Sequence, residues 1–329
     1  MSIRLINLWA TGALVIVMAA LPARSDEGFY ASSAGPYEVV NVESVPLAMP
    51  DSDRVMEVRV AYPEGGEVPF PWIVLSHGTF SSKDMYAPVV DHWVSHGYVV
   101  MLPNHPDANF GWMPSSEDSM RENNMIRAAD LSFLVDNVDQ IIAAVPELEG
   151  KIDKDHLIAA GHSVGSLVAM YNTGLEIRHP NTGEIVSHEE SRFDAVVMLS
   201  DPSKMALQPD DLWKGSTVPT FLGTGTEDYG TQGKGNRPTT HTMERLSGDD
   251  APPNSKYILV LDKGDHYFGG LVHRKREGLE PDHEGLAIFN SLSVAFLDSV
   301  IKHKAAAQEF LAEADIAALT KGRATLTIE

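Results

Sequence analysis

Short apolar segments alternate regularly along this chain with segments of helical apolar spacing, and this alternation limits the folds open to it. Residues 71–76 illustrate the first kind, because they form an apolar run that ends at His77-Gly78. Such runs are typical of strands that are buried on both faces of a sheet. Strands that alternate with helices form a mostly parallel central sheet with helices on both faces. The sequence therefore predicts an α/β fold.

The alternation divides the chain into short elements without an obvious break between domains. The predicted strands span residues 56–61, 71–76, 98–102, 156–160, 193–199, 217–223 and 256–261. The predicted helices span residues 86–96, 124–145, 163–172, 284–303 and 308–319. No change in composition divides the chain after its first residues, so we expect a single domain over residues 26–329. The segment from 173 to 192 is too short for a large lid domain.

The first 25 residues have the three parts of a secretory signal. Arg4 gives a positive start, an apolar run follows over residues 5–22, and Ala23-Arg24-Ser25 supplies small residues for cleavage. A membrane anchor is the alternative, because a run of about 18 residues approaches the length of a membrane span. We expect residues 1–25 to be a cleaved signal peptide. The mature chain is then secreted or periplasmic, with no stable insertion in a membrane.

Composition excludes several kinds of chemistry. The chain of 329 residues has no cysteine and a formal net charge of −21. Without cysteine it can form neither a disulfide nor a thiolate nucleophile nor a zinc–thiolate site. An acidic surface repels phosphate, so we expect neither nucleic acid nor anionic lipid as a partner. Acidic pairs such as Asp249-Asp250 are interpreted as solvated loop charges, and we expect no metal and no cofactor.

The motif Gly161-x-Ser163-x-Gly165 lies between a predicted strand and a predicted helix. Glycines let the strand and the helix approach closely, and the sharp turn between them lifts the serine hydroxyl out of the sheet. The N–H of Val164 begins the helix and would point at a developing oxyanion. The alternative is an ordinary glycine-rich turn with an incidental serine. The flanking strand and helix favour Ser163 as a nucleophile.

A serine nucleophile needs a base, because its alkoxide is not available at neutral pH. Among 13 histidines, His266 stands out because it follows the strand predicted over residues 256–261. Active sites of open α/β sheets lie at the carboxyl ends of strands. The histidines between residues 77 and 105 precede the serine and fit the usual chain order poorly. We therefore predict that His266 is the base.

Two aspartates between Ser163 and His266 follow predicted strands. Asp201 comes after residues 193–199, and Asp228 comes after residues 217–223. Either carboxylate could hold the imidazole in its working tautomer and stabilise the imidazolium. The order of strand and acid at Asp228 matches the commoner arrangement of such triads, which favours this residue. Asp201 remains the alternative.

A second oxyanion donor is expected in the loop after an early strand. Ser76-His77-Gly78-Thr79 fits this role, because Gly78 permits a turn that points the Thr79 N–H into the site beside that of Val164. The alternative is a plain turn at the end of a strand.

Four stretches of the chain together resemble the α/β-hydrolase fold. They are the Ser76-His77-Gly78 loop with the helix and strand that follow it, the helix with Arg127-Ala128-Ala129-Asp130, the turn from Gly161 to Gly165, and Gly264-Asp265-His266. Within the fold, the chain is similar to bacterial dienelactone-hydrolase-like and platelet-activating-factor-acetylhydrolase-like esterases and to the cutinase and polyester hydrolase group. The resemblance covers about residues 56–300.

The resemblance implies Ser163 as nucleophile, His266 as base, Asp228 as acid, and Thr79 and Val164 as oxyanion donors. The acetylhydrolase branch places its acid nearer to Asp201. The polyester hydrolases usually carry a disulfide, which this chain cannot form.

These observations predict a secreted serine carboxylic-ester hydrolase that acts through an acyl-enzyme. The expected substrate is a neutral or apolar ester, either a small molecule or a polymer, with a short acyl, aromatic or polyester-like group. We expect two loops, residues 104–122 with Phe110, Trp112 and Met113, and residues 229–253, to meet it. An amidase or peptidase with the same triad and a non-catalytic binding protein of the same fold remain alternatives.

Overall fold

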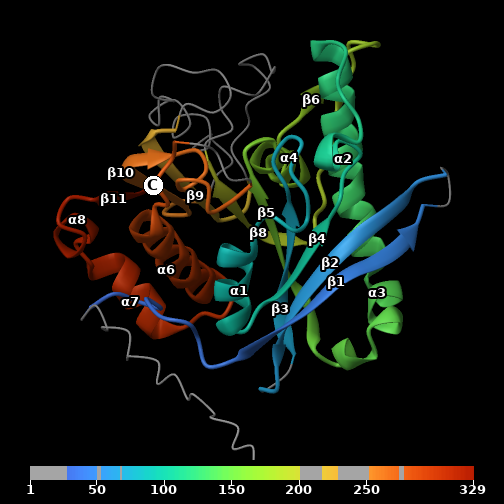
Figure 1. Ribbon diagram of the computed structural model, residues 1–329. Coiled ribbons are helices and arrows are strands. Elements are labelled where there is room, and N and C mark those ends of the chain that lie inside the picture. The colour runs from blue at the N-terminus through green and yellow to red at the C-terminus, as the bar shows by residue number, and fades with distance from the viewer. Residues whose placement is uncertain (1–27, 50–52, 67–68, 201–216, 229–251, 274–277) are drawn as a thin grey trace, which may run out of the picture.

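The computed structural model describes residues 28–49, 53–66, 69–200, 217–228, 252–273 and 278–329 (Figure 1). Nine strands form its large sheet: β1 Glu38–Ala48, β2 Val55–Glu64, β3 Phe70–Ser76, β4 Val99–Pro103, β5 Ile152–His162, β8 Phe193–Leu199, β9 Thr220–Glu227, β10 Lys256–Asp265 and β11 Ala324–Ile328. Their order across the sheet is β1-β2-β4-β3-β5-β8-β9-β10-β11. The run from β4 to β10 in this order is parallel, whereas β1, β2 and β11 pair antiparallel at the edges. The predicted α/β class and mostly parallel sheet are confirmed.

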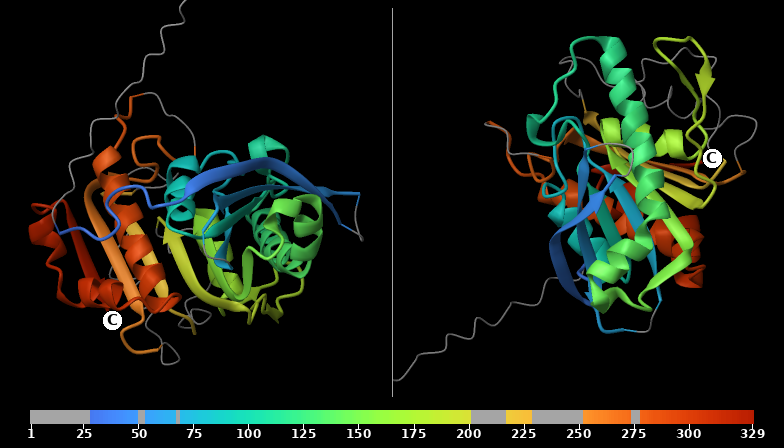
Figure 2. Two further views of the ribbon diagram at one scale, coloured as in Figure 1. Left: turned by 90° about the horizontal axis from the view of Figure 1, so that it is seen from below. Right: turned by 90° about the vertical axis from the view of Figure 1, so that its right-hand side faces the viewer.

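Helices cover both faces of the sheet (Figures 1 and 2). Their bounds are α1 Ala87–Ser95, α2 Glu117–Asp136, α3 Val138–Ala144, α4 Val164–Asn172, α6 His283–Val300, α7 Ala305–Glu313 and α8 Ile316–Leu319. Trp72 and Val74 of β3 pack into the core beneath α2, α3 and α4, while Ile73 and Leu75 pack beneath α1 and α6. This alternation is the expected result of burying both faces of a strand.

The sequence patterns missed both edge strands and misplaced several helix ends. β1 and β11 were not predicted, and α2 begins at Glu117, inside the stretch expected to be a loop. Ser116 caps this helix, because its side chain accepts from the Ser119 N–H while the Ser119 hydroxyl accepts from the Ser116 N–H. The polar composition of residues 104–122 concealed this helix start.

Two predicted helices are each broken into a pair. The helix expected over residues 124–145 is divided at Asn137, whose side-chain amide donates to the Phe133 carbonyl at 2.7 Å. Such side-chain bonds compete with the helical ladder. The helix expected over 308–319 is divided at Ala314, and Asp315 then caps α8 by accepting from the Ala318 N–H.

The segment from 173 to 192 contains a two-stranded ribbon of β6 (Ile177–Arg178) and β7 (Ile185–Val186). The predicted signal peptide, residues 1–25, lies outside the described residues. In the described part of the chain, no helix combines the length and apolar character that crossing a membrane requires.

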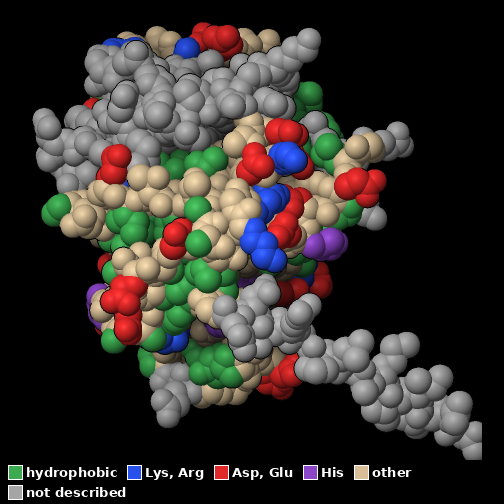
Figure 3. All heavy atoms as spheres, turned by 90° about the vertical axis from the view of Figure 1, so that its left-hand side faces the viewer, with side chains coloured by type: hydrophobic (Ala, Val, Ile, Leu, Met, Phe, Trp, Pro, Cys, Tyr) green, Lys and Arg blue, Asp and Glu red, His purple; other side chains and the backbone are tan. Residues whose placement is uncertain are grey.

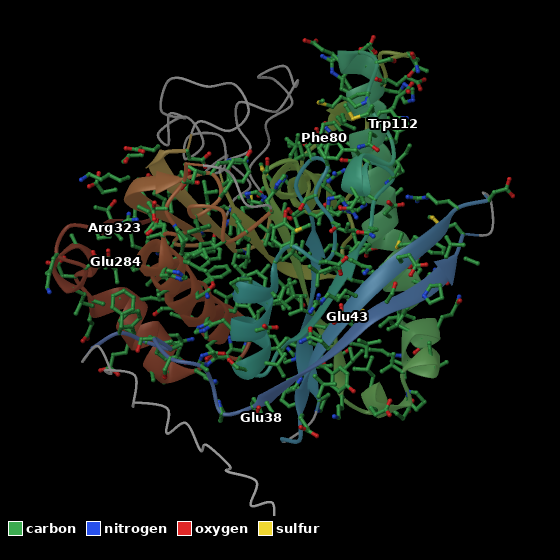
Figure 4. All side chains as sticks on the ribbon, in the orientation of Figure 1. Glu38, Glu43, Phe80, Trp112, Glu284 and Arg323 are labelled. Carbon is green, nitrogen blue, oxygen red and sulfur yellow. The ribbon has the colours of Figure 1, made fainter. Side chains whose placement is uncertain are left out.

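Acidic, basic and apolar side chains are mixed on the face shown in Figure 3. Arg323, which precedes β11, forms ion pairs with Asp282 at 2.5 Å and Glu284 at 3.6 Å. Asp282 is the N-cap of α6, and Arg323 and Glu284 lie close together in Figure 4. This pairing joins the last edge strand to the start of a core helix.

The backbones of β3, β5 and α4 meet without side chains between them. A Cβ atom on Gly161 would overlap the Gly165 carbonyl, and a Cβ atom on Gly165 would overlap the Ser76 carbonyl at the end of β3. Glycine is therefore required at both positions. The contact holds the loop after β3 against the first turn of α4.

We expect Gly165→Ala to lower the free energy of unfolding by about 3 kcal/mol, because the overlapping atoms belong to backbone and cannot rotate away. Urea denaturation measures the change. Gly150→Ala is the control. Gly150 has a φ of 72° and open space around its Cα, so alanine there should cost only about 1 kcal/mol. Equal losses in both variants would contradict this account of Gly165.

Candidate active site

The three residues predicted as nucleophile, base and acid each follow directly on a strand. Ser163 follows β5, Asp228 follows β9 and His266 follows β10. These strands are parallel, so their carboxyl ends lie at one edge of the sheet, where sites in α/β folds form. All three side chains are buried. The structure thus brings together residues that are up to 103 positions apart in the chain.

Hydrogen bonds connect the three side chains in a line. His266 Nε2 lies 2.9 Å from Ser163 Oγ, and His266 Nδ1 lies 2.6 Å from Asp228 Oδ1. An ionised carboxylate can only accept, so Nδ1 carries the proton and Nε2 accepts from the serine hydroxyl. Thr224 Oγ1 donates to the second oxygen of Asp228 at 2.9 Å. In this geometry the imidazole can remove the serine proton and the carboxylate can stabilise the resulting imidazolium.

Ser163 occupies a strained turn, which we call the serine turn (residues 161–165). Its backbone has φ 60° and ψ −120°, a conformation that non-glycine residues rarely adopt. The Ser163 N–H donates to the Leu199 carbonyl at 3.0 Å, and the Ser166 hydroxyl donates to the Gly161 carbonyl at 2.9 Å. These bonds hold the strained residue in place between β5 and α4.

Ser200 belongs to the same cluster, and the sequence analysis missed it. It follows β8, has a φ of 75°, and places its Oγ 2.8 Å from His266 Nδ1. Its position at the end of a parallel strand was the one sequence signal that it could belong to the site. No sequence motif marks a second serine that contacts the histidine, so the residue was not predicted. The alternative acid, Asp201, lies outside the described residues.

The two residues predicted to stabilise an oxyanion, Thr79 and Val164, line one small cavity. The N–H groups on both sides of Thr79 are held by side chains, because Gly78 donates to Tyr86 Oη at 2.8 Å and Phe80 donates to a carboxylate at 2.9 Å. The Thr79 carbonyl lies 3.0 Å from His273 Nε2. The loop of residues 77–80, which we call the β3 loop, is therefore fixed where it faces the start of α4.

A fully buried ion pair supports the β3 loop from behind. Arg127 donates to Asp107 at 2.9 and 2.6 Å and to the His77 carbonyl at 2.6 Å. The Asp107 carboxylate also accepts from the Phe80 N–H. Burial acts to raise the pKa of Asp107, but the charge and hydrogen bonds of Arg127 outweigh it and lower that pKa overall. The pair thus ties both ends of the loop to α2.

A second buried network lies beside the first and explains the Asp130 of the Arg-x-x-Asp helix. Asp130 accepts from Arg54 at 2.9 Å and from His105 Nδ1 at 2.9 Å. The Ser76 hydroxyl then donates to His105 Nε2 at 2.9 Å. Burial lowers the pKa of His105. This histidine, which chain order made a poor candidate for the base, supports the end of β3 instead.

His162 links three parts of the site through its two ring nitrogens. Its Nε2 donates to the His266 carbonyl at 2.9 Å, and its Nδ1 lies 3.2 Å from Tyr86 Oη, which in turn accepts from the Gly78 N–H. Burial holds the pKa of His162 well below 6.5, so the ring is neutral at neutral pH and its Nδ1 accepts from the Tyr86 hydroxyl. The serine turn, the histidine loop and the β3 loop are thereby connected.

Aromatic side chains lie where substrate contacts were predicted. Phe80 stacks on Phe110 with ring centroids 5.0 Å apart, and Phe80 and Trp112 line the cavity beside Thr79 and Val164 (Figure 4). Met113, also predicted to meet substrate, is exposed. Most of the second predicted loop, residues 229–251, lies outside the described residues.

No family model matches this chain, and no curated protein matches it. The geometry of the site and the sequence motifs that form it are therefore the basis for proposing a function.

We expect Arg127→Met to lower the free energy of unfolding by about 3–5 kcal/mol, because it leaves the Asp107 carboxylate buried without its cation. The double variant Arg127→Met/Asp107→Leu removes both charges and should recover part of the loss. Arg192→Met is the control, since Arg192 pairs with Asp136 at the surface and should cost less than about 1 kcal/mol. Urea denaturation of all the variants gives the comparison, and an Arg127 variant as stable as the control would refute a buried pair.

We expect the protein to lose stability in mild acid. Burial lowers the pKa values of His77, His105 and His162 below 6.5, so the unfolded chain binds protons that the folded chain does not. The free energy of unfolding should fall as pH drops below about 6.5, by up to about 1.4 kcal/mol per pH unit for each histidine. Urea denaturation across this range measures the slope, and His162→Gln should reduce it. Stability that does not change from neutral pH to about pH 5 would contradict the prediction.

Proposed function

We propose that this protein is a serine hydrolase of the α/β-hydrolase fold that cleaves carboxylic esters through an acyl-enzyme on Ser163. The observation that carries the proposal is the hydrogen-bonded line from Asp228 through His266 to Ser163 Oγ. Two further features support it. The serine lies on a strained turn between a strand and a helix, and the three residues follow one another in the order serine, acid, histidine.

In the first half of the proposed reaction, His266 Nε2 takes the proton of Ser163 as Oγ bonds to the ester carbonyl carbon. The carbonyl oxygen becomes an oxyanion, which accepts hydrogen bonds from the N–H groups of Thr79 and Val164. Collapse of this intermediate breaks the bond to the alcohol, and the imidazolium returns its proton to the leaving oxygen. The acyl group remains on Ser163.

In the second half, His266 removes a proton from water, and the water oxygen attacks the acyl carbon. Collapse then breaks the bond to Ser163 Oγ, which regains the proton from the imidazolium, and the free acid leaves. Asp228 holds the Nδ1 proton through both halves, so the same tautomer serves each transfer. The strained backbone of Ser163 keeps Oγ in one place while the proton moves.

The surroundings of the site support a neutral ester with an apolar portion. Phe80 and Trp112 supply aromatic surface next to the proposed oxyanion donors. The net charge of −21 disfavours anionic substrates. Export by the signal-like residues 1–25 belongs to the same proposal, with a secreted or periplasmic enzyme as the product.

We expect Ser163→Ala to lower kcat for p-nitrophenyl butyrate by about 10⁴-fold or more, because the acyl-enzyme cannot form. Ser33→Ala is the control and should leave kcat unchanged, since Ser33 is exposed and its carbonyl contacts His96 ahead of β4, away from the carboxyl ends of the strands. A fluorophosphonate probe should label the unchanged protein and the Ser33 variant but not the Ser163 variant. Normal turnover by Ser163→Ala, or its labelling by the probe, would overturn the proposal.

A further inference from the structure

Ser200 is a second serine beside the proposed base, and the reaction described above does not use it. It follows β8 directly, is 4 % exposed and has a φ of 75°. This φ lies in the left-handed region, which a residue with a Cβ atom rarely adopts. Such strain persists only where the surrounding structure imposes it, most often at functional sites. The conformation of Ser200 is thus imposed by its neighbours.

Both neighbours of β8 in the sheet hold this strand end. The Ser200 N–H donates to the Gly223 carbonyl of β9 at 2.7 Å. On the other side, the Leu199 carbonyl accepts from the Ser163 N–H at 3.0 Å and from the Ser166 hydroxyl at 3.0 Å. The end of β8 is therefore fixed between the serine turn and β9.

This position brings two oxygens to the same ring nitrogen of His266. Asp228 Oδ1 lies 2.6 Å from Nδ1, and Ser200 Oγ lies 2.8 Å from it. The ionised carboxylate can only accept, so Nδ1 carries a proton and Ser200 Oγ is a second acceptor. In the reverse arrangement the Ser200 hydroxyl would donate to a bare Nδ1, and the carboxylate would then face a nitrogen lone pair. One N–H is therefore shared by acceptors from the ends of two strands.

We propose that Ser200 is a positioning residue for the base, and that its Oγ accepts from His266 Nδ1–H together with Asp228. A single acceptor lets the imidazole pivot about the line from Nδ1 to the carboxylate, which moves Nε2 relative to Ser163 Oγ. A second acceptor from a different strand removes this freedom. Both bonds strengthen when the ring takes the serine proton, because a charged donor forms stronger hydrogen bonds than a neutral one. This inference rests on the proposed esterase activity and adds a residue to it.

Two variants remove the second acceptor. Ser200→Ala should lower kcat for p-nitrophenyl butyrate about tenfold and leave KM within about twofold, because the loss falls on proton transfer and not on binding. Ser200→Gly removes the same hydroxyl and also relieves the left-handed backbone. The glycine variant should therefore lose as much kcat as the alanine variant without becoming less stable in urea.

Ser293→Ala is the matched control. Ser293 lies in α6, is fully buried, and its Oγ also accepts from a ring N–H, that of Trp93 Nε1 at 2.9 Å. Alanine there should lower the free energy of unfolding and leave kcat unchanged.

Two further measurements separate a role at Nδ1 from a general weakening of the fold. The fluorophosphonate probe should label Ser200→Ala about tenfold more slowly than the unchanged protein but to the same final extent, since every folded chain still carries Ser163. In protein labelled with ¹⁵N-histidine, the Nδ1–H resonance that is missing in His266→Gln should move in Ser200→Ala and stay in place in Ser293→Ala.

A kcat within about twofold of the unchanged protein in both Ser200 variants would overturn the inference and leave ester hydrolysis intact. A lower kcat with an unmoved Nδ1–H resonance, or with a loss that the fraction of labelled chains explains fully, would overturn it as well. If the unchanged protein neither hydrolyses the ester nor reacts with the probe, the proposed function is wrong, and the inference is wrong with it.

Discussion

The site depends on a close contact between three pieces of backbone. Gly161 and Gly165 let β5, α4 and the end of β3 touch without intervening side chains. That contact sets the distance between the serine turn and the β3 loop, and hence between Ser163 and the two N–H groups proposed to hold the oxyanion. Preorganised donors are effective because they need not move when charge develops. A methyl group at either glycine would separate the parts that must act together.

Buried charge and buried histidines hold this arrangement from behind. The free energy lost by desolvating two charges usually offsets the attraction between them, so a buried ion pair adds little net stability. Such a pair nevertheless fixes geometry where several hydrogen bonds converge. Arg127 contacts the β3 loop through the His77 carbonyl, and Asp107 contacts it through the Phe80 N–H. His162 extends the support to the histidine loop through its bond to the His266 carbonyl, and burial disfavours the charged form of its ring. Protonation of these buried histidines in acid therefore destabilises the hydrogen bonds that position the site.

The sequence predicted the parts of the site that follow local rules. Ser163 was recognisable from glycines between a strand and a helix, and His266 and Asp228 from their places after strands in chain order. Ser200, Asp107 and the other supporting residues were not, because their contacts join segments that only the folded sheet brings together. The same reason explains the missed edge strands, since β11 pairs with β10 from more than 50 residues away. The start of helix α2 was misplaced for a local reason, because its capping residue Ser116 lies in a polar stretch.

One carboxylate, that of Asp107, holds groups of both the β3 loop and helix α2. Asp107 holds the Phe80 N–H, which fixes the β3 loop next to Thr79, and it also holds Nδ2 of Asn123, which turns the amide oxygen away from it. The β3 loop, which carries Thr79, and the Asn123 side chain of α2 are thus oriented by the same anion. Because Arg127 holds the Asp107 carboxylate in place, loss of this ion pair would release both the β3 loop and the Asn123 side chain. A substitution at Asp107 would therefore change the support of the β3 loop and the orientation of the Asn123 amide together.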